Sequence, residues 1–474
     1  MTFASFSQRV LGDARIQPHP EVPPGGPQAN QDYVMAVKDQ LLVSAALGKS
    51  VKVTKSMVDG ALQEMYGFTP ILLTTLLDQL NQANWPAVDD VLILEIDLAA
   101  LRGSTIYQLV DHLRAHFVGH PPRIFSPNHV AIPAPNDWGC PYGPPSPSPK
   151  DFVLPVAQEP RVAVAVIDCG FNWDATKMGP PPAAAVAHQQ AELLPTAAQV
   201  KNTGPHWQAG TVEGLVTVPD INRAQRLVAL TGHAVFTQSQ IFAGCPHAMT
   251  TGYDHHGSFL DRAGVELPTE FGVARSLCQA ALAGRPPKVI DVEFAFPVYE
   301  DMPSMVWDTA LTVCGFVGTP PAIDFASSAA VVAPAGNQNS SVPRFPGALS
   351  HMFQAPPFQN VICVGSTAPA TSPPQPAAAA GPYSNNGPWV TCSVDGTNVV
   401  SSFPKVSARL EDAETAAPVR LLQGFAQWTG TSFSAPQVAA MISCEIVAGG
   451  LNPMAAFQQV VHGAIATPEL GLIL

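Results

Sequence analysis

The sequence is poor in charge, since Asp, Glu, Lys and Arg together make up 12% of its 474 residues. The 23 Lys and Arg stand against 36 Asp and Glu, which gives a formal net charge of −13. Clustered cations are needed to bind a phosphate backbone, so a nucleic-acid partner is disfavoured. With 46% hydrophobic residues, the chain is also too apolar for a disordered protein.

Long apolar runs and paired cysteines are missing as well. No stretch approaches the ~18 consecutive apolar residues that a membrane span needs, and the first residues lack the apolar core of a secretory signal. The eight cysteines contain no CxxC pair, so zinc clusters lack support. We expect buried thiols at Cys169, Cys363 and Cys444, and the even count leaves disulfides open. A cytoplasmic protein without a membrane partner is the interpretation that follows.

Proline and glycine, 49 and 36 residues, are abundant and mark the expected boundaries. Proline removes a backbone donor and resists both helix and sheet, so a proline-rich stretch favours a linker or an extended arm. We expect a flexible tail at 1–28, an N-terminal domain at 29–132, a linker at 133–158 and a larger domain at 159–474.

Within the N-terminal domain, apolar residues at three- and four-residue steps predict helices at 30–47, 57–66 and 69–84. A strand at 90–98, a helix at 104–117 with Ser104 as its N-cap, and a strand at 123–132 follow. The second group predicts a compact α+β unit.

The larger domain shows valine-rich runs that alternate with helical segments. Such runs are typical of parallel strands covered on both faces. We therefore predict an α/β fold of three layers with a parallel sheet. The expected strands are 161–168, 288–296, 329–337 and 360–366, and the expected helices are 270–283, 304–314 and 432–448.

Three polar residues stand where this fold would place a site. Asp168 and Asn337 each end a buried strand, at the sheet edge where open α/β proteins bind ligands. Ser432 lies in a tight turn before the most apolar helix, whose positive end favours a developing oxyanion. Each residue alone also fits an ordinary turn or cap.

Together these segments resemble the subtilisin-like serine proteases, the subtilase family. The likeness rests on VAVIDCG around Asp168, VAPAGN ending at Asn337 and GTSFSAP around Ser432, with further similar segments at 383–390 and 401–403. It covers residues 161–474. The resemblance implies a serine endopeptidase in which Asp168 orients a histidine, Ser432 attacks the peptide bond, and Asn337 contributes to an oxyanion hole.

The resemblance also orders the catalytic residues as aspartate, histidine, serine. We favour His233 in LTGHAVF, where Gly-His opens a predicted helix. His256 in DHHGSF is the rival, because a glycine and a hydroxyl residue follow it. The remaining histidines in the allowed interval are His188, His206, His247 and His255.

Two departures from the family pattern stand out. Around His233, the usual Gly and Thr are replaced by Ala234 and Val235, and small residues are replaced by Gln238 and Ser239.

In the strand 288–296, Glu293 and Ala295 occupy places where the family typically has a serine and a glycine that line the substrate groove. Ala335 and Gly336 are further candidate substrate-binding residues. A carboxylate at Glu293 would favour a basic substrate residue, and the alternative is a side chain in solvent or paired with an arginine.

The unit at 90–132 resembles the inhibitory propeptides of this family, with SPNHV at 126–130 as its motif. The resemblance implies a zymogen in which the N-terminal domain inhibits the enzyme and the proline-rich stretch is the arm or the cleavage region. The helices expected at 30–84 lie outside this resemblance; extra packing and a docking surface for a partner remain open.

The expected partner is a peptide or protein substrate. We expect no cofactor. Calcium is common in the family, but no segment of this sequence matches a calcium-binding loop. A non-catalytic binding module on the same fold is the main alternative. A carboxyl-type serine peptidase is disfavoured by the pair Gly232–His233.

Overall fold

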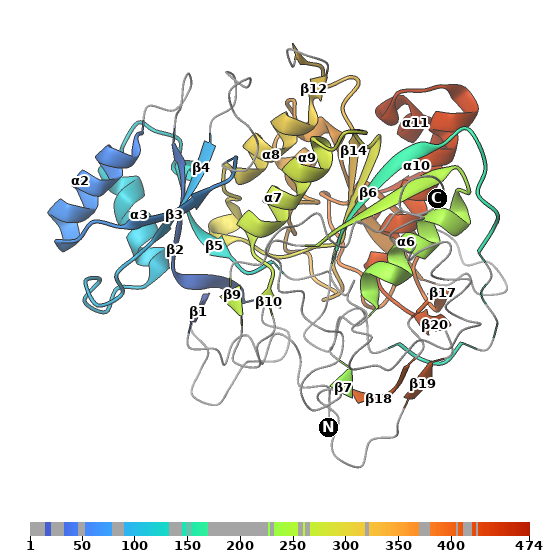
Figure 1. Cartoon of the computed structure of the whole chain (residues 1–474), viewed down its shortest axis with the longest axis horizontal. Coiled ribbons are helices and arrows are strands. Elements are labelled where there is room, and N and C mark those ends of the chain that lie inside the picture. Colours follow the sequence, from blue (N-terminus) through green and yellow to red (C-terminus); the bar gives the residue numbers. More distant parts are fainter. Residues whose placement is uncertain are drawn as a thin grey trace.

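A computed structural model of the chain shows an N-terminal part, up to residue 131, beside a larger C-terminal part (Figure 1). The structure describes residues 15–19, 33–45, 53–77, 90–131, 145–148, 150, 152, 154–168, 226–227, 232–254, 259–260, 266–317, 322–368, 380–403, 406–410, 420–422 and 425–474.

The C-terminal part is built on an eight-stranded sheet in the order β21-β22-β16-β15-β14-β11-β6-β8. All neighbours pair in parallel except β21 and β22. Each of the four strands expected from the valine-rich runs is confirmed. The strands are β6 (Val162–Asp168), β8 (Ala248–Asp254), β11 (Val289–Val292), β14 (Ala330–Pro334), β15 (Val361–Thr367), β16 (Cys392–Asp395), β21 (Ile465–Thr467) and β22 (Gly471–Ile473).

Helices cover both faces of this sheet, which confirms the three-layer α/β prediction. Val164 and Val166 of β6 pack into a core with α10, whereas Ala165 and Ile167 pack into a second core with α7, as the two-residue period of a strand requires. One face carries α6 (His233–Gly244), α10 (Ala435–Gly449) and α11 (Pro453–Val460), and the other carries α7 (Glu270–Ala281) and α8 (Val306–Cys314).

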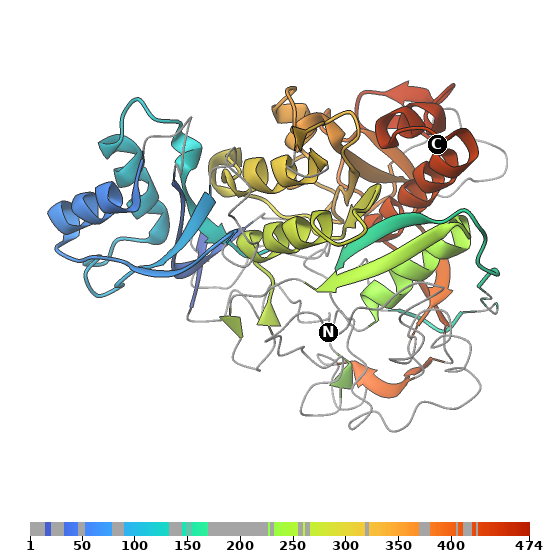
Figure 2. The ribbon, with the colours of Figure 1, turned by 45° about the horizontal axis from the view of Figure 1, so that its top comes forward.

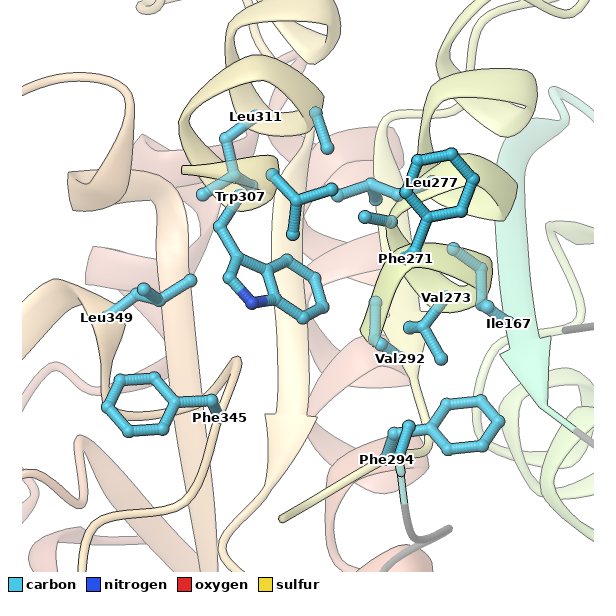
Figure 3. Close-up of a cluster of buried hydrophobic side chains, with 14 of the residues drawn as sticks. Ile167, Phe271, Val273, Leu277, Val292, Phe294, Trp307, Leu311, Phe345 and Leu349 are labelled. Atoms are coloured by element: carbon cyan, nitrogen blue, oxygen red, sulfur yellow. The ribbon is translucent and has the colours of Figure 1, made fainter. Parts of the chain in front are cut away.

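Figure 3 shows the second core, where Trp307 of α8 and Leu277 of α7 lie beside Ile167 and Val292 of the sheet.

Short elements complete the C-terminal part. They are η3 (Tyr299–Asp301), α9 (Leu349–Met352), η4 (Phe358–Asn360), η5 (Thr431–Phe433), and the paired strands β7 (Arg226–Leu227), β9 (Phe259–Leu260), β10 (Glu266–Leu267), β12 (Phe316–Val317), β13 (Ala322–Ile323), β17 (Val399–Ser402), β18 (Val406–Leu410), β19 (Arg420–Leu422) and β20 (Phe425–Trp428).

The last long helix begins later than expected. We predicted a helix from residue 432, but α10 begins at Ala435, and Ser432 lies in the preceding 3₁₀ turn η5. Proline is favoured in the first helical turn because its missing N–H would be unpaired there, and Pro436 occupies that turn.

The N-terminal part has the element order β2-α2-β3-β4-α3-β5 and a five-stranded antiparallel sheet. The strand, helix and strand expected over 90–132 are confirmed as β4, α3 and β5, although Thr105 rather than Ser104 caps the helix. The bounds are β2 (Val34–Ala45), α2 (Lys55–Tyr66), β3 (Ile71–Thr75), β4 (Asp90–Glu95), α3 (Ile106–His116), η2 (Pro122–Ile124) and β5 (Phe125–His129).

Two predicted helices are wrong. The segments 30–47 and 69–84 contain the strands β2 and β3. β2 is covered on both faces: Met35 and Val37 pack toward the C-terminal part, whereas Leu41 and Val43 pack toward α2 and α3. Outside Lys38–Gln40 the strand β2 is largely apolar, because it is buried on both sides, and such apolar runs also satisfy a helical period.

The tail expected at 1–28 is wrong in one segment. Residues Ile16–His19 form β1, which pairs antiparallel with β2 through Ile16 opposite Val37. Its backbone groups are thus satisfied by the long strand β2 despite the surrounding prolines.

The two parts share one apolar core. Met35 and Ile93 of the N-terminal sheet belong to the same cluster as Phe271 of α7 and Trp307 of α8. Both views of the ribbon place the N-terminal sheet next to these helices (Figures 1 and 2).

Polar contacts border this shared core. His129 Nδ1 lies 2.6 Å from Glu270 Oε2, and both side chains are buried. Arg123 pairs with Asp308 at 2.5 Å, and its guanidinium lies 4.2 Å from the centre of the Phe353 ring.

The proline-rich segment contacts the C-terminal part in the stretches that the structure describes. The main chain of Ser146 exchanges two 2.9 Å hydrogen bonds with Gln427 of β20, and Leu154 packs on Val235 and Phe242 of α6. These stretches contain no helix or longer strand, in keeping with an extended arm.

Six cysteines lie in the described part of the chain, and all are free thiols. Cys363 is buried as expected, Cys444 is half-buried, and Cys169 lies outside the described residues. In these ranges no single helix has the length and apolar composition of a membrane span, although the bent pair Thr431–Gly449 and Pro453–Val460 meets that test together.

The helices α6 and α10 touch closely enough to predict an effect on stability. A Cβ at Gly244 would lie 2.8 Å from Cβ of Ala440. Gly244→Ala is therefore expected to lower the free energy of unfolding by about 1–3 kcal/mol through overpacking, measured by urea unfolding. The control is Gly284→Ala, at an exposed site with no atom within 4 Å of the added Cβ. Equal stability of the two variants would contradict the prediction.

Candidate active site

Asp168 and His233 form the centre of the candidate site. Asp168 ends β6, and His233 is the first residue of α6, after Gly232 in a left-handed conformation at φ 69°. His233 Nδ1 lies 2.8 and 2.9 Å from the two carboxylate oxygens of Asp168. This contact fixes the orientation of the imidazole and points Nε2 away from the aspartate.

Thr237 is a second partner of the aspartate. Its hydroxyl donates to Asp168 Oδ2 at 2.9 Å, so the carboxylate is held from two positions on α6. Residues four apart lie on the same face of a helix, so the spacing from His233 was a usable signal for Thr237. Our sequence reasoning missed it.

Aromatic rings surround the imidazole. The ring centres of Trp428 and Phe433 lie 5.8 and 5.7 Å from that of His233. Phe433 follows Ser432 directly, and its carbonyl accepts a hydrogen bond from Gln240 of α6 at 3.2 Å. These contacts bring the serine turn η5 against the helix that carries the histidine.

Ser432 and His233 are both without exposed surface, as is Asp168. Ser432 Oγ and His233 Nε2 each lack a hydrogen-bond partner in the structure. The hydrogen bond that would join the serine to the histidine is therefore not formed in this state. Catalytic hydrogen bonds are often long before substrate binds, so this leaves a catalytic role for the pair intact.

Asn337 lies on the other side of the serine turn. Its Oδ1 accepts from the N–H of Thr431 at 2.8 Å and from the Thr431 hydroxyl at 3.0 Å. The same hydroxyl accepts from the N–H of Gly336 at 3.1 Å. Because its oxygen is held by the residue before Ser432, the amide of Asn337 has a fixed orientation next to the serine.

Asn385 shapes the loop after Asn337. Its Oδ1 accepts from the N–H groups of Gln338 and Ser340, and its Nδ2 donates to Ala335 O at 2.9 Å. A side chain at Gly336, where φ is +99°, would collide with Asn385 Nδ2 at 2.5 Å. Asn385, in the segment 383–390 noted for its likeness, thus holds the loop that follows Asn337.

Glu293 is buried beneath the site, and the expectation of a solvent-facing or arginine-paired side chain is wrong. Within the described part of the chain, neither its carboxyl oxygens nor those of Asp291 make a hydrogen bond of good geometry, although the two carboxyls are close enough to interact. Burial raises the pKa of both carboxyls well above their usual values. For Glu293 the nearby Asp291 and Asp168 carboxyls raise the pKa further, and the Ser432 hydroxyl opposes the shift.

The other candidate groove residues are Ala295, Ala335 and Gly336, and all three are buried. Ala335 and Gly336 follow β14, directly before Asn337, and Ala295 follows β11. The N–H of Ala335 donates to Val364 O at 2.8 Å and so belongs to the sheet. Substrate binding by these residues and a preference for basic substrates stay predictions.

The rival His256 lies outside the described residues, as do His188, His206 and His255. His247 contacts the other end of β6 from Asp168, since its Nδ1 lies 3.0 Å from the carbonyl oxygen of Pro160, just before that strand begins. Over the described ranges, no group of three or more His, Cys, Asp or Glu side chains has the arrangement of a metal site.

Comparisons with known proteins point to one family. Residues 313–448 match the family model described as the subtilase family. A search of curated proteins gave no match.

Among solved structures, the chain is similar to a lanthipeptide protease, with 18% identity over 65% of this chain and 80% of that chain and a TM-score of 0.40. It is also similar to fervidolysin from Fervidobacterium pennivorans, a keratinolytic enzyme related to subtilisin, with 15% identity over 93% of this chain and 60% of that chain and a TM-score of 0.48. At these scores neither likeness bears on substrate.

The hydroxyl of Thr237 gives a prediction about this site. Thr237→Val keeps the shape of the side chain but removes the hydrogen bond to Asp168, and a hydrogen bond to a charged group contributes about 1.5–3 kcal/mol. We expect a fall in kcat of about tenfold or more on a peptide substrate, with little change in KM. Thr237→Ser, which keeps the hydroxyl, is the control, and a Val variant as active as the Ser variant would refute the role.

Proposed function

We propose that Asp168, His233 and Ser432 are the catalytic triad of this chain, a serine-type endopeptidase whose residues 313–448 match the subtilase family, and that Asn337 belongs to its oxyanion hole. The observation that carries the proposal is the contact of His233 Nδ1 with both oxygens of Asp168, at 2.8 and 2.9 Å. A base that must act through Nε2 needs its other nitrogen held in this way.

In the proposed reaction, Ser432 Oγ attacks the peptide carbonyl carbon while its proton passes to His233 Nε2. The carboxylate of Asp168 stabilises the imidazolium that forms. The imidazolium then gives the proton to the leaving amine as the C–N bond breaks, and an acyl-enzyme remains on Ser432. Water, deprotonated by the same nitrogen, releases the second product and restores the serine.

The oxyanion formed in each step needs a donor. In the proposal this is the amide Nδ2–H₂ of Asn337, whose opposite atom Oδ1 is held by Thr431. An amide that is already oriented needs no reorganisation when the charge appears, and loss of one such donor typically costs ~10²–10³ in rate.

We also propose that the N-terminal part inhibits the enzyme. Three observations support this: the triad side chains have no exposed surface, the N-terminal sheet shares a core with α7 and α8, and the arm at 145–148 pairs with β20. β20 carries Trp428, which contacts the imidazole. Substrate reaches Ser432 only after part of the surrounding chain moves.

A catalytically silent binding module is the alternative function. The observation that favours it is the missing hydrogen bond between His233 Nε2 and Ser432 Oγ. The first experiment below separates the two. A cytoplasmic location, the absence of a cofactor and a peptide or protein as substrate stay predictions.

The nucleophile is tested by covalent labelling. A fluorophosphonate probe is expected to label the wild-type chain at Ser432, and both labelling and peptide hydrolysis are expected to vanish in Ser432→Ala. Labelling is followed by mass spectrometry of the modified peptide. Ser434→Ala is the matched control, because Ser434 Oγ donates to Val394 O rather than facing His233. A wild-type chain that stays unlabelled after removal of the N-terminal part would favour the silent module.

Inhibition is tested at the ion pair between Arg123 and Asp308. Arg123→Ala removes a partly buried pair, which typically costs 2–5 kcal/mol, so docking of the N-terminal part weakens. The rate on a short chromogenic peptide is expected to rise at least about fivefold. Lys55→Ala is the control, since Lys55 pairs with Asp59 inside α2 and away from the interface. An unchanged rate in Arg123→Ala would refute inhibition through this contact.

A further inference from the structure

Three carboxyl side chains gather on one face of the sheet beneath the serine turn. Val166 and Val289 pack against α6 and α10, and every second residue of a strand lies on the same face. Asp168 comes two residues after Val166, and Asp291 and Glu293 come two and four residues after Val289, so all three side chains point toward α6 and α10. The N–H of Glu293 donates to Ile167 O at 2.9 Å, which continues the register of β11 and β6 to the site. All three side chains are fully buried.

The cluster has more acids than partners. Among the described residues, Asp168 is held by His233 and Thr237, whereas the four oxygens of Asp291 and Glu293 make no hydrogen bond of good geometry, although the two carboxyls are close enough to interact with each other. The groups that act on the pair are Asp168 of β6 and the Ser432 hydroxyl of η5, and within the described ranges they include no Lys or Arg. Three negative charges on fully buried side chains are strongly unfavourable.

The Ser432 hydroxyl lies close to the carboxyl of Glu293. In the described part of the chain, Ser432 Oγ and His233 Nε2 also make no hydrogen bond of good geometry, and the hydroxyl is near enough to Glu293 to influence its ionisation. A neutral carboxyl carries an O–H donor, which a carboxylate does not. A serine that accepts one hydrogen bond keeps its own proton for another acceptor.

We propose that Asp291 and Glu293 stay protonated beneath Ser432, and that the neutral carboxyl of Glu293 is a positioning residue that turns the Ser432 hydroxyl toward His233. In this arrangement the Asp291 carboxyl O–H donates to the unprotonated oxygen of the Glu293 side-chain carboxyl. The O–H of that Glu293 carboxyl donates to Ser432 Oγ, and the Ser432 O–H donates to His233 Nε2. The proposal rests on the catalytic triad proposed above.

The test compares Glu293→Gln with Glu293→Ala. The glutamine amide keeps a donor and no charge, so kcat is expected to stay within about threefold of wild type. The alanine variant loses the donor, and kcat is expected to fall by roughly 10- to 100-fold with KM within about twofold. A Gln variant as impaired as the Ala variant, or an Ala variant as active as wild type, overturns the proposal.

The pH profile supplies a second readout, which does not need the alanine variant to fold. When Glu293 loses its proton, the carboxylate accepts the Ser432 hydroxyl and draws it from His233, so kcat of the wild type falls on the alkaline side. Glu293→Gln has no such proton, so this alkaline fall is expected to disappear over about pH 6–10. An alkaline fall of the same size in the Gln variant overturns the proposal.

Stability gives a third, independent sign. The folded-state pKa of Glu293 lies above its ordinary value of 4.5, so the wild type loses stability as pH rises through the interval between the two. The melting temperature of Glu293→Gln relative to wild type is therefore expected to increase with pH, and a difference independent of pH contradicts a protonated Glu293. Labelling of wild-type Ser432 by the fluorophosphonate separates the two proposals: if Ser432 is labelled but the Glu293 variants behave otherwise than expected, only the role of Glu293 fails, and if Ser432 is not labelled, the triad itself fails.

Discussion

The contact between Asp168 and His233 is the interaction on which the rest of the site depends. It joins the end of a central strand to the first residue of α6, and its two distances of 2.8 and 2.9 Å leave the imidazole little freedom. Thr237 reinforces it from the next turn of the same helix. The serine turn η5 is in turn held against α6 by the hydrogen bond from Gln240 to Phe433 O, and against the loop after β14 by the contacts of Thr431 with Asn337.

A second constraint is the joint burial of the N-terminal sheet and the helices α7 and α8. Glu270 illustrates it: one oxygen faces His129 of the N-terminal part, and the other accepts from the Trp307 indole at 2.8 Å and from the Ser304 hydroxyl at 2.9 Å. A buried carboxylate needs such partners, and here one of them comes from the other part of the chain. The polar network and the apolar core therefore specify the same docking arrangement.

The sequence predicted the strands and helices of the C-terminal part better than those of the N-terminal part, for a physical reason. Valine-rich runs between helical segments are typical of a parallel sheet, so β6, β11, β14 and β15 were predictable, as was the end of β6 at Asp168; β14 ends at Pro334, three residues before Asn337. β2 was not, because a strand covered on both faces lacks polar alternation. The burial of Glu293 was also missed. Its position after a strand was predictable from the sequence, but its neighbours Asp168 and Ser432 come from distant segments that only the fold brings together.

The shared core has a consequence for any chain from which the N-terminal part is removed. Phe271 of α7 packs in one cluster with Met35 and Ile93 of the N-terminal sheet, so removal of that sheet exposes apolar surface on α7 and α8. Large exposed apolar patches promote self-association of soluble proteins. The solubility of a shortened chain therefore depends on what covers that face.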